Sequence, residues 1–260
     1  MLALKLTIVP LFLLAVSLAG KYYGPGIAGW LAGLPIVAGP ILYFVAVDNG
    51  AHFASISASS SAAAVFASVS FSLVYARTSM RYRWSISLVS GLAVWLCAAA
   101  ALSALPSSPL TGGVVALITL LGAPRLFPVS ESAPISNHIT YGELVLRMAA
   151  GALLTLTVTL TAKTFGATWS GLLAVFPVLG IVLAVFSQRR HGASYSAVLL
   201  RSMVTGLYSF ALFCVVLSLS LDAMPIPAAF VIATIGSLVV QAISRRRVMP
   251  HASPITSSSN

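Results

Sequence analysis

Long runs of apolar residues fill most of this chain, and short stretches that hold most of its Lys and Arg residues separate them. A run of about 20 apolar residues is long enough to cross the hydrocarbon core of a membrane as a helix. The pattern therefore predicts membrane helices, although the shortest run, Leu110–Ala123, is also compatible with a re-entrant segment. The predicted segments are Leu2–Ala19, Gly26–Val47, His52–Tyr75, Trp84–Leu105, Leu110–Ala123, Leu144–Thr161, Thr168–Phe186, Ser194–Leu221 and Pro225–Ile243.

A second pattern relates the two halves of the chain to each other. One register, with a constant offset of 142 residues and no gap, is kept over many positions, which indicates an internal duplication. The first segment also has the features of a cleavable signal peptide, but its partner in the second half favours its retention. The matched pairs include Lys21/Lys163, Gly24/Gly166, Gly29/Gly171, Leu31/Leu173, Ala32/Ala174, Pro35/Pro177, Phe44/Phe186 and Gly50/Gly192.

The composition narrows the class of protein. Hydrophobic residues make up 59% of the chain and charged residues only 7%, whereas a soluble domain carries about a quarter charged residues. The net charge of +10 is typical of cytoplasmic loops that collect Lys and Arg, which explains it better than nucleic-acid binding. The two cysteines, Cys97 and Cys214, lie in separate apolar segments, so we expect neither a disulfide nor a metal site nor any cofactor.

The basic residues decide between eight and nine spans. When Leu110–Ala123 is counted, nearly all Lys and Arg residues outside the spans share one side, and only Lys5 and Lys163 face the other. The positive-inside rule makes the basic side cytoplasmic, with the N-terminus outside and the C-terminus inside. Five spans then separate each element from its copy, so the two halves are inverted.

The expected fold is an all-α polytopic membrane protein of about nine transmembrane helices, arranged as two inverted four-helix repeats joined by a linker helix. Its regions are the first repeat (1–105), the linker helix and a cytoplasmic loop (106–142), the second repeat (143–247) and a disordered cytoplasmic tail (248–260). The expected location is the bacterial inner membrane.

One stretch of the second half resembles a known family. It reads Ser170-Gly171-Leu172-Leu173-Ala174-Val175-Phe176-Pro177 and is followed by an aromatic-rich span. It is similar to the Ala-Gly-Leu-x-x-Leu-Phe-Pro hallmark of the GlpM-like family of small four-span bacterial inner-membrane proteins. Ser170 and Val175 depart from that hallmark, and the first half is a weaker copy. The resemblance implies a link to glycerol metabolism or exopolysaccharide production, but no known substrate or catalytic residue.

Helix breaks are the first candidate site. Pro35 and Pro177 lie near the middle of their segments, and a proline there removes a backbone donor and interrupts the helix. Two inverted, broken helices would bring exposed backbone groups together at mid-depth, where transporters of this plan bind substrate. The alternative is that the neighbouring Gly29 and Gly171 serve close packing around a tolerated kink.

Polar side chains inside spans are the second candidate. Arg201 is the basic residue deepest in a segment, with Thr205 and Ser209 on the same face, and it would attract an anion. Snorkelling toward the interface is the alternative. Ser57 and Ser61 belong to a hydroxyl stripe that either binds a ligand or links helices. Glu143 and Arg147, four residues apart, are interpreted as a surface pair.

The predicted function is that of a small-solute or ion transporter or channel with a site at mid-depth. The alternative is a non-catalytic accessory subunit of an envelope or exopolysaccharide pathway. An enzyme is not expected, because no paired carboxylates, nucleophile triad or phosphate loop appears in the sequence. The expected partners are the lipid bilayer and a small anionic or polar solute, with a homodimer or an envelope protein as further partners, and no nucleic acid.

Overall fold

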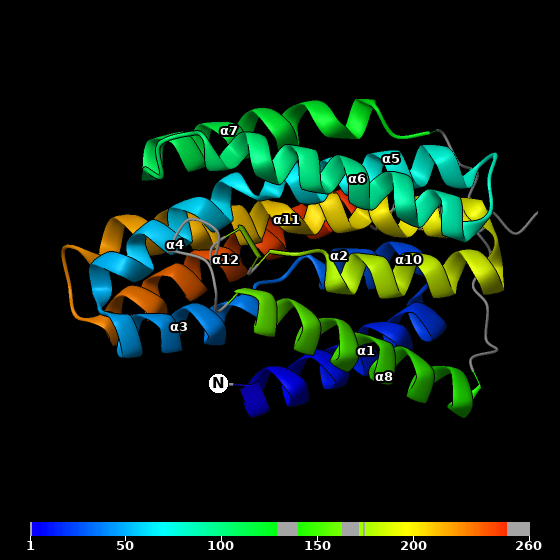
Figure 1. The fold of residues 1–260 in the computed structure, drawn as a ribbon, viewed down its shortest axis with the longest axis horizontal. Coiled ribbons are helices and arrows are strands. Elements are labelled where there is room, and N and C mark those ends of the chain that lie inside the picture. Colours follow the sequence, from blue (N-terminus) through cyan, green and yellow to red (C-terminus); the bar gives the residue numbers. More distant parts are fainter. Residues whose placement is uncertain (1, 129–139, 163–171, 174, 249–260) are drawn as a thin grey trace, which may run out of the picture.

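A computed structural model describes residues 2–128, 140–162, 172–173 and 175–248 of the chain. Within these ranges all regular structure is helical (Figure 1). Gly171 and the tail after Val248 lie outside the described residues, as does much of the predicted cytoplasmic loop. The helices are α1 (Leu2–Tyr23), α2 (Pro25–Ala32), α3 (Ala38–Asn49), α4 (Ala51–Ala63), α5 (Val65–Ser79), α6 (Trp84–Ser103), α7 (Pro109–Gly122), η1 (Ala123–Arg125), α8 (Tyr141–Ala162), α10 (Val178–His191), α11 (Ala193–Leu221) and α12 (Ile226–Val248).

Six helices of the described chain are long and apolar enough to cross a membrane. They are α1, the continuous pair α4–α5, α6, α8, α11 and α12, and each begins and ends near a predicted segment. Apolar side chains such as Leu110, Ile118 and Ile243 cover the outer faces of this bundle. An apolar exterior of this kind fits a protein surrounded by lipid, because soluble proteins rarely expose such large apolar surfaces to water.

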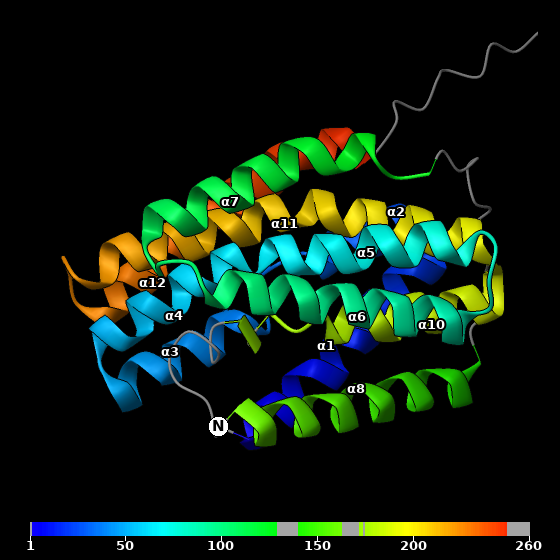
Figure 2. The ribbon, with the colours of Figure 1, turned by 45° about the horizontal axis from the view of Figure 1, so that its top comes forward.

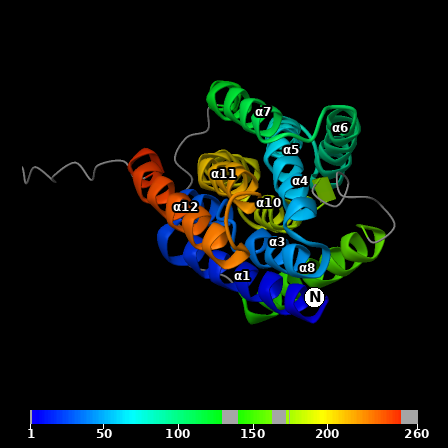
Figure 3. The same cartoon turned by 90° about the vertical axis from the view of Figure 1, so that its left-hand side faces the viewer.

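Helix α11 forms the centre of the bundle. Figure 3 looks along the helices and shows α11 ringed by its neighbours, and α2, α4, α5, α7, α10 and α12 all pack against it. Helices α1 and α8 lie side by side along one edge, as Figure 2 also shows. The core is rich in Ala and Ser, whose small side chains let membrane helices approach closely, and Leu and Val fill the space between them.

Two segments are broken helices. Helix α2 ends at Ala32 and α3 begins at Ala38, with Pro35 in the gap between them. In the second half, Val175 to Pro177 is not helical, and Pro177 directly precedes α10. Each proline lacks the amide hydrogen that would continue the helix, so the chain turns at that point.

The longest helical stretch of each half begins and ends at corresponding positions of the two halves. Helices α4 and α5 meet at Ala64 and together occupy Ala51–Ser79, a length of 29 residues. Helix α11, Ala193–Leu221, also has 29 residues, and each of its ends is displaced by 142 from that pair. The two run antiparallel, because Ser55 near the start of α4 contacts Ser218 near the end of α11. Helix α12 packs on α11 as α6 packs on α5.

One end of the bundle is strongly basic. The last turns of α1, α5, η1 and α10 carry Lys21, Arg77, Arg125 and Arg190, and these helices end on the same side of the molecule, at the right in Figure 1. At this end a hydrogen bond links α10 to the turn after α5: the side-chain amide of Gln188 donates to the carbonyl of Tyr82 over 3.1 Å.

Candidate functional site

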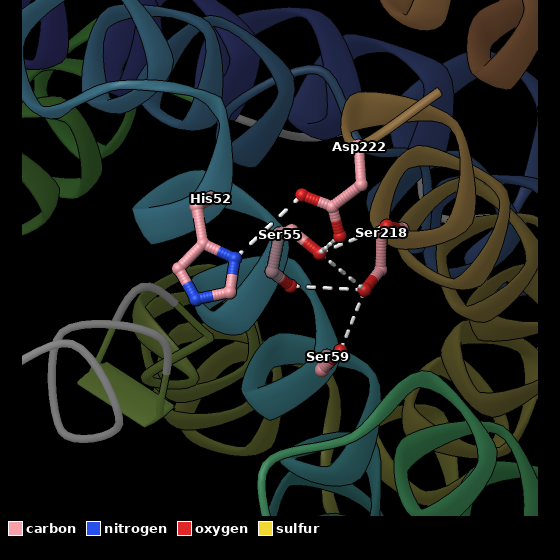
Figure 4. Close-up of polar contacts among 5 residues, drawn as sticks. All are labelled: His52, Ser55, Ser59, Ser218 and Asp222. Carbon is pink, nitrogen blue, oxygen red and sulfur yellow. Dashed lines mark hydrogen bonds and ion pairs between the residues drawn. The ribbon is translucent and has the colours of Figure 1, made fainter. Parts of the chain in front are cut away.

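A seam of hydroxyl groups joins the two long antiparallel helices (Figure 4). Ser55 and Ser59 lie one turn apart on α4 and face Ser218 of α11. The Oγ of Ser55 donates to the carbonyl of Ser218 over 2.9 Å, and the Oγ of Ser218 donates to the carbonyl of Ser55 over the same distance. The Oγ atoms of Ser59 and Ser218 are 2.6 Å apart. We call these three residues the serine seam.

A carboxylate and an imidazole lie at the exposed end of the serine seam. Asp222 follows α11, and its Oδ2 accepts a hydrogen bond from Ser55 Oγ over 3.2 Å. His52 Nδ1 lies 3.7 Å from the other carboxylate oxygen, and both side chains are exposed. The single proton of the Ser55 hydroxyl has three acceptors within reach, the carbonyl and the Oγ of Ser218 and the carboxylate of Asp222, so rotation of this hydroxyl changes its partner.

The inner end of the serine seam reaches a small cavity. Ser59 and Ser60 line it, and Ser60 Oγ donates to Ser107 Oγ across it over 3.1 Å. Its volume is about 10 Å³, close to the smallest space that holds one water molecule. The remaining lining comes from α4, α6, the turn between α6 and α7, α7 itself and Leu172, which precedes the second helix break: Ala63, Leu102, Leu105, Pro106, Thr111, Gly112 and Leu172.

Each broken helix receives a side-chain donor from the opposite half of the chain. The carbonyl of Trp30, in the last turn of α2, accepts from the Gln241 amide of α12 over 2.9 Å. The carbonyl of Val175, at the second break, accepts from Ser68 Oγ of α5 over 3.0 Å. A carbonyl freed by a helix break inside lipid needs such a partner, because no water is present to replace it. Each helix break therefore lies at a contact between the first and the second half of the chain.

The predicted residues at the breaks lie in different environments. Pro35 is half-buried and Pro177 is buried. Gly29 lies so close to α11 that a Cβ placed on it would be 2.0 Å from the carbonyl oxygen of Leu199. Close backbone packing, the alternative expected from the sequence, therefore accounts for Gly29. Its predicted counterpart Gly171 is outside the described residues.

The predicted hydroxyl stripe is buried. The Oγ of Ser61 donates to the carbonyl of Ser57, one turn earlier on α4. The Oγ of Ser57 is buried without a hydrogen-bond partner among the described residues. Ser68 lies on the same helical face as Ser57 and bonds the second break. This face of α4–α5 thus points toward the broken helix of the second half.

Arg201, Thr205 and Ser209 do not form one site. The side chain of Arg201 is exposed, and the hydroxyl of Thr205 bonds the backbone carbonyl of Arg201 at 3.5 Å. Ser209 is buried and donates to Gln241 Oε1 over 2.7 Å. The three residues follow one stripe from the exposed surface into the packed contact between α11 and α12. The exposure of Arg201 fits the snorkelling alternative.

The interpretation of Glu143 and Arg147 as a surface pair is wrong in one respect. The two side chains form an ion pair at 2.5 Å, but the Arg147 side chain is only 4% exposed. Arg147 lies within a predicted span, and an ionisable residue inside a span is the sequence feature that could have marked it as a candidate site residue. No sequence signal placed Asp222 beside Ser55, because that contact depends on how α4 and α11 pair.

The described residues contain no cluster of His, Cys, Asp or Glu that could hold a metal ion. In comparisons with known proteins, no family model, curated protein or solved structure matches this chain.

Proposed function

We propose that this chain is an inner-membrane transporter or channel for a small polar solute, built from two inverted four-helix units and a linker helix. The solute moves along the serine seam between α4–α5 and α11, toward the broken helices at mid-depth. The observation that carries the proposal is the chain of hydroxyls from Asp222 to the cavity at Ser59. The chain has nine spans in this proposal, since α7 and the two broken segments join the six helices of full membrane length.

The matched helices support the inverted arrangement. Helices α4–α5 and α11 span equal lengths, and both α4 and α5 pack against α11. Ser55 meets Ser218 at one end of this contact, and near the other end Tyr75 OH donates to Gln188 Oε1 in the last turn of α10. Duplicated units of opposite orientation are a common plan of secondary transporters, which bind substrate near the midplane at broken helices.

The chemistry of the serine seam favours a neutral or cationic solute. Hydroxyl oxygens both donate and accept hydrogen bonds, so they can replace the water around a small polar molecule. The charged group at the mouth is the carboxylate of Asp222, which repels anions and attracts cations. Arg201, whose charge would favour an anion, is exposed on the surface of α11 and does not contribute to the seam.

The basic end of the bundle defines its orientation in this proposal. Cytoplasmic loops carry the excess of Lys and Arg, so the ends of α1, α5 and α10 face the cytoplasm. The mouth with Asp222 and His52 then faces outward. This arrangement agrees with an N-terminus outside and a C-terminus in the cytoplasm.

The second candidate function is a non-catalytic accessory subunit of an envelope pathway. The small volume of the cavity favours it, because a space for about one water molecule admits no larger solute without movement of helices. The resemblance to the GlpM-like family stays a prediction and agrees with either candidate.

Solute flux into liposomes tests the proposed function. Purified protein is reconstituted, and light scattering after an osmotic step reports the entry of urea and glycerol, while a trapped pH dye reports protons. We expect faster entry of at least one of these than in protein-free liposomes. Ser59→Leu and Ser218→Leu should return that rate to the protein-free value, because a branched apolar side chain fills the serine seam.

Ser90→Leu is the matched control. Ser90 lies on α6, away from the seam, and its hydroxyl bonds only carbonyls of its own helix among the contacts described. This variant should keep the wild-type rate. Wild-type protein that passes neither urea, glycerol nor protons, although correctly inserted, would refute the proposal for these solute classes and favour the accessory subunit.

A further inference from the structure

The guanidinium group of Arg147 is buried between three helices near the basic end. Its Nη2 donates to Glu143 Oε1 and its Nη1 donates to Ser17 Oγ of α1 over 3.3 Å. The group also lies 5.5 Å from the ring centroid of Phe186 on α10. Its Nε is buried and has no hydrogen-bond partner among the described residues. A buried charged donor without a partner is costly, so this group has capacity for one more acceptor.

A second guanidinium group shares the same carboxylate. Arg190 Nε lies 4.0 Å from Glu143 Oε2, and the Arg190 side chain is half-exposed. Two positive charges thus face one negative charge, which leaves an excess of one positive charge at this place. His191 lies nearby, and burial and then the charge of Arg147 lower its pKa below the ordinary value. We call Glu143, Arg147 and Arg190 the arginine cluster.

An anion with several oxygens fits this excess of charge and donors. Guanidinium groups bind phosphate through paired N–H···O bonds, and they do so best where water is scarce. The arginine cluster lies at the end of the bundle where Lys21, Arg77 and Arg125 also gather, so this whole end attracts anions. Basic pockets between helices at the level of the headgroups suit the phosphates of acidic lipids.

We propose that Arg147 and Arg190 form a binding site for a phosphate group, and that Glu143 is an internal counter-ion which the phosphate displaces. The same chemistry serves the headgroup of an acidic phospholipid and a soluble phosphate. The site is separate from the serine seam, so this proposal holds whether or not a solute moves along the seam.

Thermal unfolding of the full chain in a neutral detergent tests the site. Three additions are compared: phosphatidylglycerol, phosphatidylcholine, and inorganic phosphate against chloride at equal ionic strength. We expect phosphatidylglycerol or inorganic phosphate to raise the unfolding midpoint of the wild type in a saturable way. Stabilisation by phosphatidylglycerol alone identifies a lipid site, and stabilisation by inorganic phosphate identifies a site for soluble phosphate.

Three variants assign that stabilisation to the arginine cluster. Arg190→Gln should weaken the apparent affinity about tenfold, because it removes one charged hydrogen-bond donor. Glu143→Gln should strengthen the affinity, since it removes the competing carboxylate, whereas a purely structural Glu143 gives no gain. Arg201→Gln, an exposed arginine of α11, is the control and should match the wild type.

The proposal does not depend on Arg147→Gln, which can fail to fold because Arg147 is buried. It is overturned if neither addition stabilises the wild type more than phosphatidylcholine or chloride does. It is also overturned if Arg190→Gln and Arg201→Gln respond equally.

Discussion

Gly50 and Gly192, which are 142 residues apart, hold the same backbone conformation. Gly50 has φ 89° and ψ 163°, and Gly192 has φ 86° and ψ 178°. Each glycine ends one helix and begins the next, joining α3 to α4 and α10 to α11. Positive φ of this kind is available to glycine at little cost and to few other residues. The same turn therefore occurs at both of these positions, and each turn precedes a 29-residue helical stretch.

Alanine at either turn should destabilise the protein by similar amounts. No heavy atom lies within 4 Å of a Cβ at Gly50 or Gly192, so the cost comes from the backbone conformation alone. We expect Gly50→Ala and Gly192→Ala each to lower the free energy of unfolding by roughly 1–3 kcal/mol. Chemical unfolding in detergent measures it. Two variants as stable as the wild type would mean that the chain relaxes out of this conformation.

Alanine at Gly29 should be more harmful than alanine at Gly122. A Cβ on Gly29 would meet the backbone of α11 at 2.0 Å, whereas nothing lies within 4 Å of one on Gly122. We expect Gly29→Ala to destabilise by about 1–3 kcal/mol through overpacking. Gly122→Ala should be neutral or slightly stabilising, because alanine favours the helix. The difference in unfolding midpoint between the two variants checks the prediction, and equal midpoints would contradict the close packing of α2 on α11.

Loss of the Ser68 hydroxyl should weaken the second helix break. Ser68→Ala leaves the carbonyl of Val175 without its side-chain donor, at a cost of about 1–3 kcal/mol. Thr78→Ser is a mild control on the same helix, since its hydroxyl bonds carbonyls of α5 itself and is retained. Limited proteolysis and unfolding midpoints report the effect. A Ser68→Ala variant with wild-type stability would show that the break does not depend on this bond.

Acidification should destabilise the protein through His191. Burial and then Arg147 and Arg190 lower its pKa from the ordinary 6.5, against an opposing effect of Glu143, while the Tyr195 ring packs on it at 4.6 Å. The unfolded chain therefore takes up the proton first as the pH falls. The stability that the neutral His191 contributes is fully present above pH 6.5 and is lost progressively as the pH falls below that value. We expect the wild type to lose more stability than His191→Gln between about pH 8 and pH 5. Parallel curves for the two proteins would contradict this.

The apolar pattern was sufficient to locate the helices. The predicted segment His52–Tyr75 became α4–α5, Ala51–Ser79, and Ser194–Leu221 became α11, Ala193–Leu221. Such agreement is expected, because a lipid environment requires a continuous apolar run and allows few other structures. The breaks at Pro35 and Pro177 were predictable for a local reason, the missing amide hydrogen.

The candidate site could not be predicted in the same way. Ser55 meets Ser218 only because particular faces of α4 and α11 pack together, and helices that are apolar all round give no sign of which face is inside. For the same reason the sequence singled out Arg201, which is exposed, and not Arg147, which is buried against residues of α1 and α10. Polarity along one helix does not report its tertiary neighbours.

Cysteine accessibility at Ser59 tests the central claim, a solute path along the serine seam, most directly. Cys97 and Cys214 are first replaced, and Ser59→Cys is compared with Ala67→Cys, a buried position of α5 outside the seam. A small, charged, membrane-impermeant thiol reagent is applied from the outer side of sealed vesicles. A water-accessible path predicts that Ser59→Cys reacts much faster than Ala67→Cys. Equal and negligible reaction at both positions, from either side of the membrane, would contradict the path.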